Sequence, residues 1–166
     1  MPLPPTVHVR QGTAQDMHAL LGLVRELAIY ERAEHEVHAT TEDFVRDGFG
    51  HAPAFSTLVA CDEAGTMVGF ALYFFGYSTW EGRRVLCLED LFVKSEHRGR
   101  GVGRRLMGAL ASCAQQAHCT RFEWRVLDWN APAIGFYESL GAELLREWRV
   151  VRIQGQALSA LANAPE

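Results

Sequence analysis

Hydrophobic residues recur with two different periods at the start of the chain. Residues 7–10 alternate between apolar and polar side chains, which predicts a short first strand. From residue 17 to about residue 30 the apolar positions are spaced three and four apart, which is typical of the buried face of a helix. Thr13, with Asp16 three residues later, has the side chains to cap this helix at its start.

The middle of the chain alternates between short apolar segments and turn-forming residues. A polar stretch follows the first helix, and a short helix is predicted over residues 41–47, ended by Gly48. Two strands then flank a turn and form a hairpin, and a third has the nearly continuous apolar run of a strand in the middle of a sheet. These three strands are predicted over residues 55–61, 67–77 and 84–93.

The last third of the chain predicts a helix–strand–helix order and a closing pair of strands. A glycine-rich segment leads into a helix with apolar residues at Leu106, Leu110, Cys113 and Ala117. Asn130 is the predicted cap of the next helix, which runs to about Leu140 and is stopped by Gly141. The remaining strands are predicted over residues 122–127, 142–145 and 148–153. We expect one domain over residues 1–166, with an ordered core of about residues 6–162.

Composition favours a soluble globular protein. Hydrophobic residues make up 48% of the chain and charged residues 22%. No apolar run approaches the ~20 residues that a membrane-spanning helix needs. The first residues lack the basic and apolar regions of a secretory signal. We therefore expect a cytoplasmic protein with no membrane partner.

Charge and the metal-ligating residue types exclude further classes. The formal net charge of −4 argues against nucleic acid as a partner, because phosphate binding requires a basic surface. The four cysteines form no CxxC pair and the seven histidines form no HExxH pattern. Free thiols and no metal ion are expected.

The segment from Arg98 to Arg104 has the features of an anion-binding loop. Glycines allow a close approach of the backbone, and the unpaired N–H groups at a helix start point at phosphate oxygens. The candidate contacts are Arg98, Gly99, Arg100, Gly101, Val102, Gly103 and Arg104. A Rossmann loop would come earlier in the chain, and a Walker loop would need Gly-Lys-Ser/Thr, which is absent.

Two motifs resemble those of the GNAT acetyltransferases. The first is Arg98-x-x-Gly101-x-Gly103 after the segment Leu88–Val93. The resemblance implies that the loop holds the pyrophosphate of acetyl-CoA and that the backbone of Leu91, Phe92 and Val93 binds its pantetheine arm. It also implies oxyanion-stabilising N–H groups near Phe92.

The second motif is Trp129-Asn130-x-Pro132-x-Ile134-x-Phe136-Tyr137-x-x-x-Gly141-Ala142. By the same resemblance, Asn130 and Ala133 contact CoA and Tyr137 lies beside its sulfur. The implied fold is the α/β (α+β) GNAT fold, with a central mixed, mostly antiparallel, splayed sheet of about six to seven strands and about four flanking helices.

Almost the whole chain resembles the diamine (spermidine/spermine) and thialysine N-acetyltransferases. The matching pieces are Arg25-Glu26-Leu27-Ala28-x-Tyr30-Glu31, Asp47-Gly48-Phe49-Gly50, Tyr77-Ser78-Thr79-Trp80, Leu88-Glu89-Asp90 and Leu127-Asp128-Trp129-Asn130. The resemblance implies a homodimer with acetyl-CoA as co-substrate. The substrate-binding residues that it implies are Tyr30, Glu31, Trp80, Glu89, Asp90, Glu123, Trp124 and Arg125.

Transfer of an acetyl group to an amine requires a base and an acid. An ammonium with an intrinsic pKa of about 10 must lose a proton, and the departing thiolate benefits from one. Glu89, acting through a water molecule, is the candidate base, and Tyr137 is the candidate acid. Strict strand alternation would send Glu89 and Asp90 to opposite faces of the sheet.

The identity of the acceptor amine depends on one departure from the family pattern. Ser78 stands where the polyamine-specific enzymes carry an aspartate, so a lysine-like amino acid such as thialysine, or a short diamine, is favoured over spermine. The alternatives are a polyamine acetyltransferase, a protein-lysine acetyltransferase and a non-catalytic acyl-CoA sensor.

Overall fold

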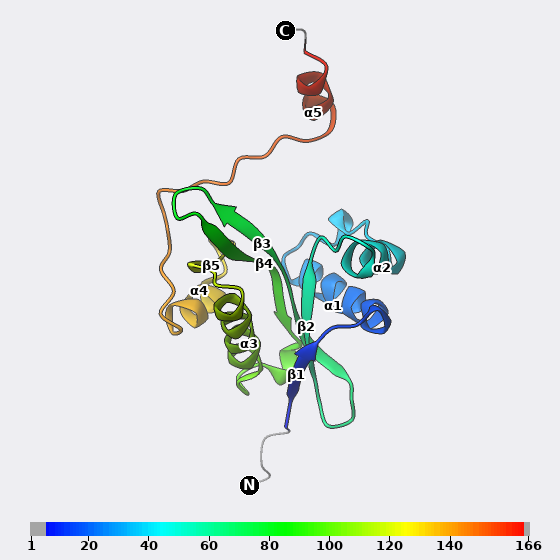
Figure 1. The fold of residues 1–166 in the computed structure, drawn as a ribbon. Coiled ribbons are helices and arrows are strands. Elements are labelled where there is room, and N and C mark those ends of the chain that lie inside the picture. Colours follow the sequence, from blue (N-terminus) through cyan, green and yellow to red (C-terminus); the bar gives the residue numbers. More distant parts are fainter. Residues whose placement is uncertain (1–5, 165–166) are drawn as a thin grey trace. The chain divides into compact units, whose positions relative to one another are not determined.

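The chain folds into two compact units that meet in sequence between Arg125 and Val126. The computed structural model describes residues 6–164. The first unit holds the sheet and three α-helices, and the second holds two further helices joined by an extended segment (Figure 1). The prediction of a single domain stays a prediction.

The sheet of the first unit has five strands whose spatial order is their order in the chain. The first four strands are antiparallel to one another in sequence, and the fifth is parallel to the fourth, which requires a crossover. This confirms the predicted mixed, mostly antiparallel sheet, with fewer strands than the six to seven expected. The strands are β1 (His8–Gln11), β2 (Ser56–Cys61), β3 (Met67–Ser78), β4 (Arg83–Val93) and β5 (Arg121–Trp124).

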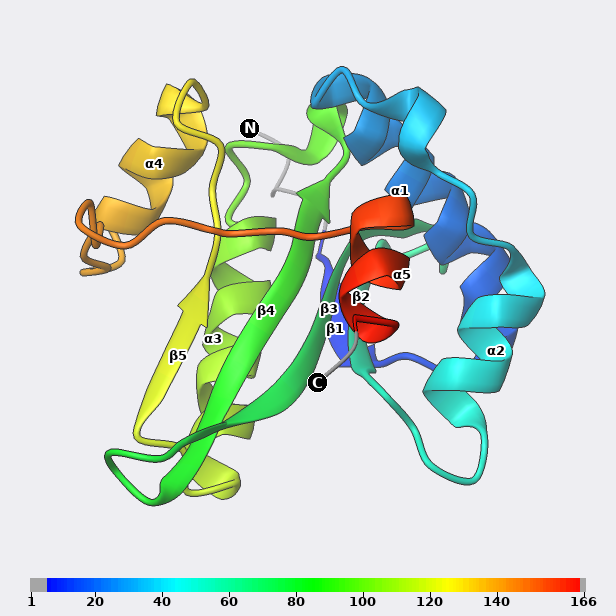
Figure 2. The ribbon, with the colours of Figure 1, turned by 90° about the horizontal axis from the view of Figure 1, so that it is seen from above.

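Helices cover both faces of this sheet. α1 (Met17–Tyr30) and α2 (Thr41–Phe49) lie over one face, and α3 (Val102–Gln116), which is the crossover between β4 and β5, lies over the other (Figures 1 and 2). The second unit contributes α4 (Ala131–Glu138) and α5 (Gly155–Ala162). Single turns of 3-10 helix occur at Ala14–Asp16, Glu34–Glu36 and Ser95–His97.

The predicted capping box of Thr13 and Asp16 forms, but it caps the 3-10 turn Ala14–Asp16 that precedes α1. The backbone N–H of Thr13 donates to a carboxylate oxygen of Asp16 over 2.7 Å. Arg10 donates to both oxygens of the same carboxylate, and these bonds hold the pKa of Asp16 far below its usual range. α2 continues past Gly48 and is capped at its start by Thr40, whose hydroxyl accepts the N–H of Asp43 over 3.2 Å.

The main core lies between α1 and the sheet. Phe70, in β3, is its largest fully buried side chain, with 0% of its surface exposed. Around it the helix residues share one face of α1 and the strand residues share one face of the sheet. The cluster comprises Met17, Leu20, Leu23, Val59, Cys61, Met67, Phe70, Leu72 and Phe92.

On the opposite face, α3 packs against β3 at Gly69. A Cβ atom at this position would lie 2.9 Å from the carbonyl oxygen of Phe92 and 3.5 Å from Cδ1 of Leu106. Only glycine fits there without a shift of β4. This close approach fixes the end of β4, from which the glycine-rich loop departs.

The predicted closing strands over residues 142–145 and 148–153 are wrong. The structure has no strand there, and a helix, α5, follows at Gly155–Ala162. The alternating side chains that indicated strands are exposed, with Trp148 at 68% and Val151 at 92%. A strand needs a neighbour to satisfy its backbone, and this segment has no strand partner among the described residues.

We expect Phe70→Ala to lower the free energy of unfolding by about 3–5 kcal/mol, because it leaves a cavity in a fully buried position. The matched control is Phe74→Ala in the same strand, whose side chain is 38% exposed. Urea denaturation of both variants measures the difference. Equal losses of stability would contradict the position of the core.

Candidate active site

β4 and β5 part in the middle of β4. Their parallel pairing runs from Val85–Arg121 to Leu88–Trp124 and then stops, while β4 continues to Val93 against β3 alone. In the part of the chain that the structure describes, the edge of residues 89–93 that faces away from β3 therefore has no strand partner (Figure 2). This is the splay that the resemblance implied, and it leaves backbone groups available for a ligand.

A β-bulge lies where the two strands part. Tyr73 pairs with Leu88 and Leu72 pairs with Asp90, so Glu89 is an extra residue without a partner in β3. A bulge interrupts strict alternation and re-aims the side chains beside it. The expectation that Glu89 and Asp90 face opposite sides of the sheet therefore does not hold across this position.

Glu89 forms an ion pair with Arg125, the residue after β5. One guanidinium nitrogen lies 3.1 Å from each of the two carboxylate oxygens. Both side chains are about half exposed, so the pair contributes little to stability. It joins the bulge of β4 to the end of β5 across the opening between the strands.

Asp90 is partly buried and makes no hydrogen bond or ion pair with another described residue. Burial, and after it the negative charges of Glu89 and Glu31, raise the pKa of its carboxyl to about 6 against the opposing effect of Arg125. The sequence placed Asp90 only among the substrate-binding residues. The sequence around Asp90 gives no sign of this environment, because the residues that bury its side chain and the charge of Glu31 come from distant parts of the chain.

The end of α1 reaches this region. Tyr30 is the last residue of α1 and Glu31 is its C-terminal cap. Glu31 is partly buried, which raises the pKa of its carboxyl. Its charge also acts on Asp90. The structure therefore brings Tyr30, Glu31, Glu89, Asp90 and Arg125 to one region, and their role in substrate binding stays a prediction.

Arg98 connects the end of α1 to the end of β4. Its guanidinium lies over the rings of Tyr30 and Phe92, with 5.1 Å and 5.4 Å to the ring centroids. Its Nε donates to the carbonyl of Val93 over 2.8 Å. The sequence assigned Arg98 to phosphate binding, whereas here it stacks on two aromatic rings and fixes the backbone before the loop.

The loop itself has the geometry of an anion site. Gly99 and Gly101 have φ angles of +71° and +80°, and a Cβ at either position would meet open space. No side chain caps α3, and its first backbone bond runs from Arg105 to Gly101, so the earlier N–H groups lack helical partners. Arg100 and Arg104 are exposed and form no bond with another described residue. These features fit the pyrophosphate of acetyl-CoA.

The other three predicted substrate residues lie on the turn between β3 and β4 and on β5, where Trp124 pairs with Leu88 beside the bulge. Trp80 sits in the turn between β3 and β4 with 91% of its surface exposed, far along the hairpin from the bulge. On β5, Glu123 is paired with Arg121 over 2.8 Å, and the ring of Trp124 lies against Phe122 with 4.7 Å between centroids. Their roles in binding stay predictions.

The motif residues of the second unit are positioned by α4. Asn130 caps this helix as predicted, because its side chain accepts the N–H of Ala133 over 3.3 Å. The ring of Tyr137 lies 5.4 Å from that of Phe136. The roles of Asn130, Ala133 and Tyr137 toward CoA stay predictions.

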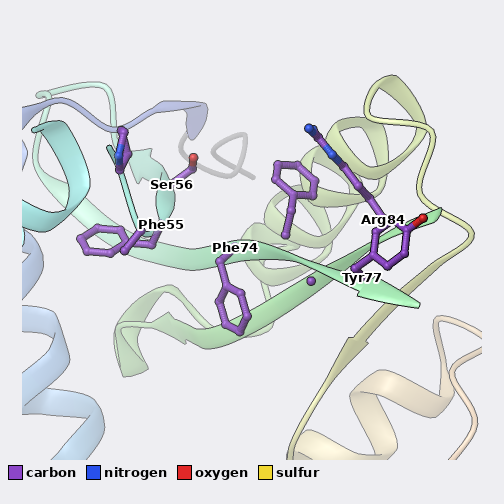
Figure 3. A pocket seen from close by; sticks show the side chains of 9 residues that line it. Phe55, Ser56, Phe74, Tyr77 and Arg84 are labelled. Carbon is purple, nitrogen blue, oxygen red and sulfur yellow. The ribbon is translucent and has the colours of Figure 1, made fainter. Parts of the chain in front are cut away.

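The structure also contains a cavity of about 440 Å³ that is separate from the candidate site residues. It is formed by the segment before β2, the outer half of β3 and the start of β4 (Figure 3). Its lining is rich in aromatic rings and contains none of the predicted site residues. The lining residues are Pro53, Ala54, Phe55, Ser56, Phe74, Phe75, Gly76, Tyr77 and Arg84.

The described residues contain no group of three potential metal ligands, and no helix among them is long and apolar enough to cross a membrane. The four cysteines are free. A splayed sheet with a glycine-rich loop at the start of a helix defines a CoA-dependent acyltransferase of the GNAT class.

Comparison with known proteins confirms this class. The model of the Acetyltransferase (GNAT) family matches residues 20–142, and the chain belongs to this family. It is therefore an acetyltransferase that uses acetyl-CoA.

Individual relatives extend the similarity over almost the whole chain. The thialysine N-epsilon-acetyltransferase of Sus scrofa is 39% identical over 95% of this chain and 98% of its own length. The spermidine/spermine N(1)-acetyltransferase-like protein 1 of Homo sapiens is 34% identical over 93% of this chain and 23% of its own length. The solved structure of an integron cassette protein from V. cholerae superimposes with a TM-score of 0.80 at 28% identity, over 95% of this chain and 98% of its own.

We expect Gly101→Ala to raise the KM for acetyl-CoA at least tenfold. A side chain at φ +80° strains the backbone by roughly 1–2 kcal/mol and displaces the N–H groups at the start of α3. Gly65→Ala is the matched control, because Gly65 has φ +82° and also faces open space, but lies in the turn between β2 and β3. Thermal unfolding and acetyl-CoA saturation curves should show similar destabilisation but a changed KM only for Gly101→Ala.

Proposed function

We propose that this enzyme transfers the acetyl group of acetyl-CoA to a primary amine of a small molecule, either a lysine-like amino acid such as thialysine or a short diamine. The observation that carries the proposal is the cluster of Glu31, Glu89 and Asp90 beside the unpaired end of β4. These three carboxylates outnumber the guanidinium groups of Arg125 and Arg98 in this region and attract a cationic amine to the strand that is expected to hold the thioester.

The relatives support the choice of acceptor. The similar protein of Sus scrofa is named for thialysine and matches this chain over nearly its full length. Ser78 supports this choice less than the sequence predicted, because its hydroxyl already has protein partners. Ser78 is buried, and its hydroxyl lies 3.3 Å from both the N–H of Glu81 and a guanidinium nitrogen of Arg121. These bonds give Ser78 a structural role at the end of β3.

The chemistry requires no covalent enzyme intermediate. A carboxylate of the β4 bulge takes the proton from the ammonium, directly or through water, and the free amine attacks the thioester carbonyl. From the sequence, Glu89 is the candidate base, Tyr137 protonates the departing thiolate, and the backbone near Phe92 stabilises the oxyanion. The acetyl donor is held by the loop from Arg98 to Arg104 and by the backbone of Leu91–Val93. A homodimer is expected from the family resemblance.

The test measures thiol release from acetyl-CoA with thialysine, lysine, ornithine, putrescine, spermidine and a lysine peptide. We expect a small amine with one or two amino groups to have the highest kcat/KM. A preference for spermidine would favour a polyamine acetyltransferase. A preference for the peptide would favour a protein-lysine acetyltransferase, and tight acetyl-CoA binding without any turnover would favour a sensor.

Tyr137→Phe should lower kcat about 10²–10⁴-fold with the preferred amine, because a general acid typically contributes this much. Tyr77→Phe is the matched control, since Tyr77 lies on the outer half of β3 with its side chain mostly exposed. Steady-state kinetics on both variants measures the effect. If the kcat of Tyr137→Phe equals that of the control, Tyr137 is not the general acid.

A further inference from the structure

The two neighbouring carboxylates of the β4 bulge have different surroundings. Both oxygens of Glu89 accept from Arg125 at 3.1 Å, and its side chain is about half exposed. Asp90 is partly buried, and its carboxyl makes no hydrogen bond or ion pair with the described residues. One carboxylate is therefore already engaged, and the other is available to a ligand.

We propose that Asp90 accepts the proton of the substrate ammonium, and that Glu89, held by Arg125, is a positioning residue. This inference rests on the proposed acetyl transfer to an amine and assigns its base. It differs from the assignment made from the sequence, which placed Glu89 in that role.

The backbone geometry supports this division. Asp90 immediately precedes Leu91–Val93, the part of β4 whose edge has no strand partner within residues 6–164 and which is expected to run along the pantetheine arm. The bulge ends the β-ladder alternation at Glu89, and the pairing resumes at Asp90 opposite Leu72. A proton acceptor at position 90 is thus anchored in a regular ladder, one residue from the expected path of the thioester.

Competition for hydrogen bonds also distinguishes Glu89 from Asp90. A substrate ammonium that approaches Glu89 has to displace the guanidinium of Arg125 from both oxygens. At Asp90 it replaces no protein partner, and burial strengthens the attraction between the two charges. The charged groups that act on Asp90 are Glu89 on β4, Glu31 at the end of α1 and Arg125 after β5.

These neighbours also make Asp90 a better base. Burial and two nearby carboxylates raise its pKa to about 6, closer to neutral pH than an ordinary aspartate. General-base catalysis is most effective when the pKa of the base lies near the working pH. Glu89 contributes to this property of Asp90 through its charge while it stays bound to Arg125.

An N–H bond of the ammonium breaks and its proton moves to an oxygen of Asp90. The nitrogen lone pair forms a bond to the thioester carbonyl carbon, the C–S bond breaks, and the sulfur is protonated as the nitrogen loses its second proton. Asp90 then returns its proton to water. Ammonium and acetyl thioester give amide, thiol and one proton.

The test compares the pH dependence of kcat/KM, between pH 5 and 8, for the full-length wild type, Asp90→Asn and Glu89→Gln. The wild type should lose activity as the pH falls through about 6, because the base must be deprotonated in the free enzyme. Asp90→Asn should lower kcat about 10²–10⁴-fold and remove this acidic limb.

Glu89→Gln should behave differently. We expect a decrease in kcat of less than tenfold and an acidic limb that remains but moves to lower pH. Removal of the Glu89 charge takes away one of the groups that raise the pKa of Asp90, and Arg125 is freed to lower it further. Glu42→Gln, on the exposed face of α2, controls for the loss of a carboxylate elsewhere.

The opposite pattern overturns the proposal. If Glu89→Gln abolishes the acidic limb while Asp90→Asn retains it, Glu89 is the base. If both variants remove the limb equally, neither carboxylate alone is the base. Thermal unfolding and acetyl-CoA binding of each variant separate a lost base from a lost fold. A wild type that acetylates none of the amines refutes the proposed function itself, whereas an active wild type with the reversed pattern refutes only the role of Asp90.

Discussion

The candidate site depends on the point where β4 stops pairing with β5. Up to Leu88 and Trp124 the two strands share a regular parallel ladder, and beyond them β4 pairs with a strand on one edge only, as far as the described residues show. An unpaired strand edge inside a protein is costly unless another molecule satisfies it. The ladder therefore ends where a ligand can bind the free edge of β4 in place of a strand. Along the chain, the carboxylate cluster lies before this free edge and the glycine-rich loop lies after it.

The electrostatic character of the site follows from the same interruption. A continuous ladder would have kept Glu89 and Asp90 on alternating faces, whereas the bulge at Glu89 leaves two adjacent carboxylates near a third, Glu31, at the end of α1. Arg125 balances only part of this charge. The result is a region that attracts cations, next to a loop with uncapped N–H groups that attracts anions. An amine and a CoA thioester require these opposite properties side by side.

Much of this arrangement could be predicted from the sequence, since α1, β2–β4, α3 and α4 are specified by local periodicity and caps. The bulge could not, because Leu88-Glu89-Asp90-Leu91 carries no glycine or other local sign of an extra residue. Arg98 illustrates a second limit: its stacking on Tyr30 depends on a contact between residues far apart in the sequence. The prediction of the closing strands was wrong because alternation of side chains specifies which face is apolar but not which strand is the partner. Residues 142–153 have no partner strand in the described chain.

Gly69 shows how far the machinery extends beyond the residues that a ligand touches. A methyl group there would press on the carbonyl of Phe92 and move the strand that is expected to carry the thioester. In a screen of random mutants for loss of activity, position 69 would score with the active-site residues, although its own backbone faces α3 and β4. Evolution of a new acyl specificity in this scaffold is thus constrained by the packing of the sheet as well as by the residues of the candidate site.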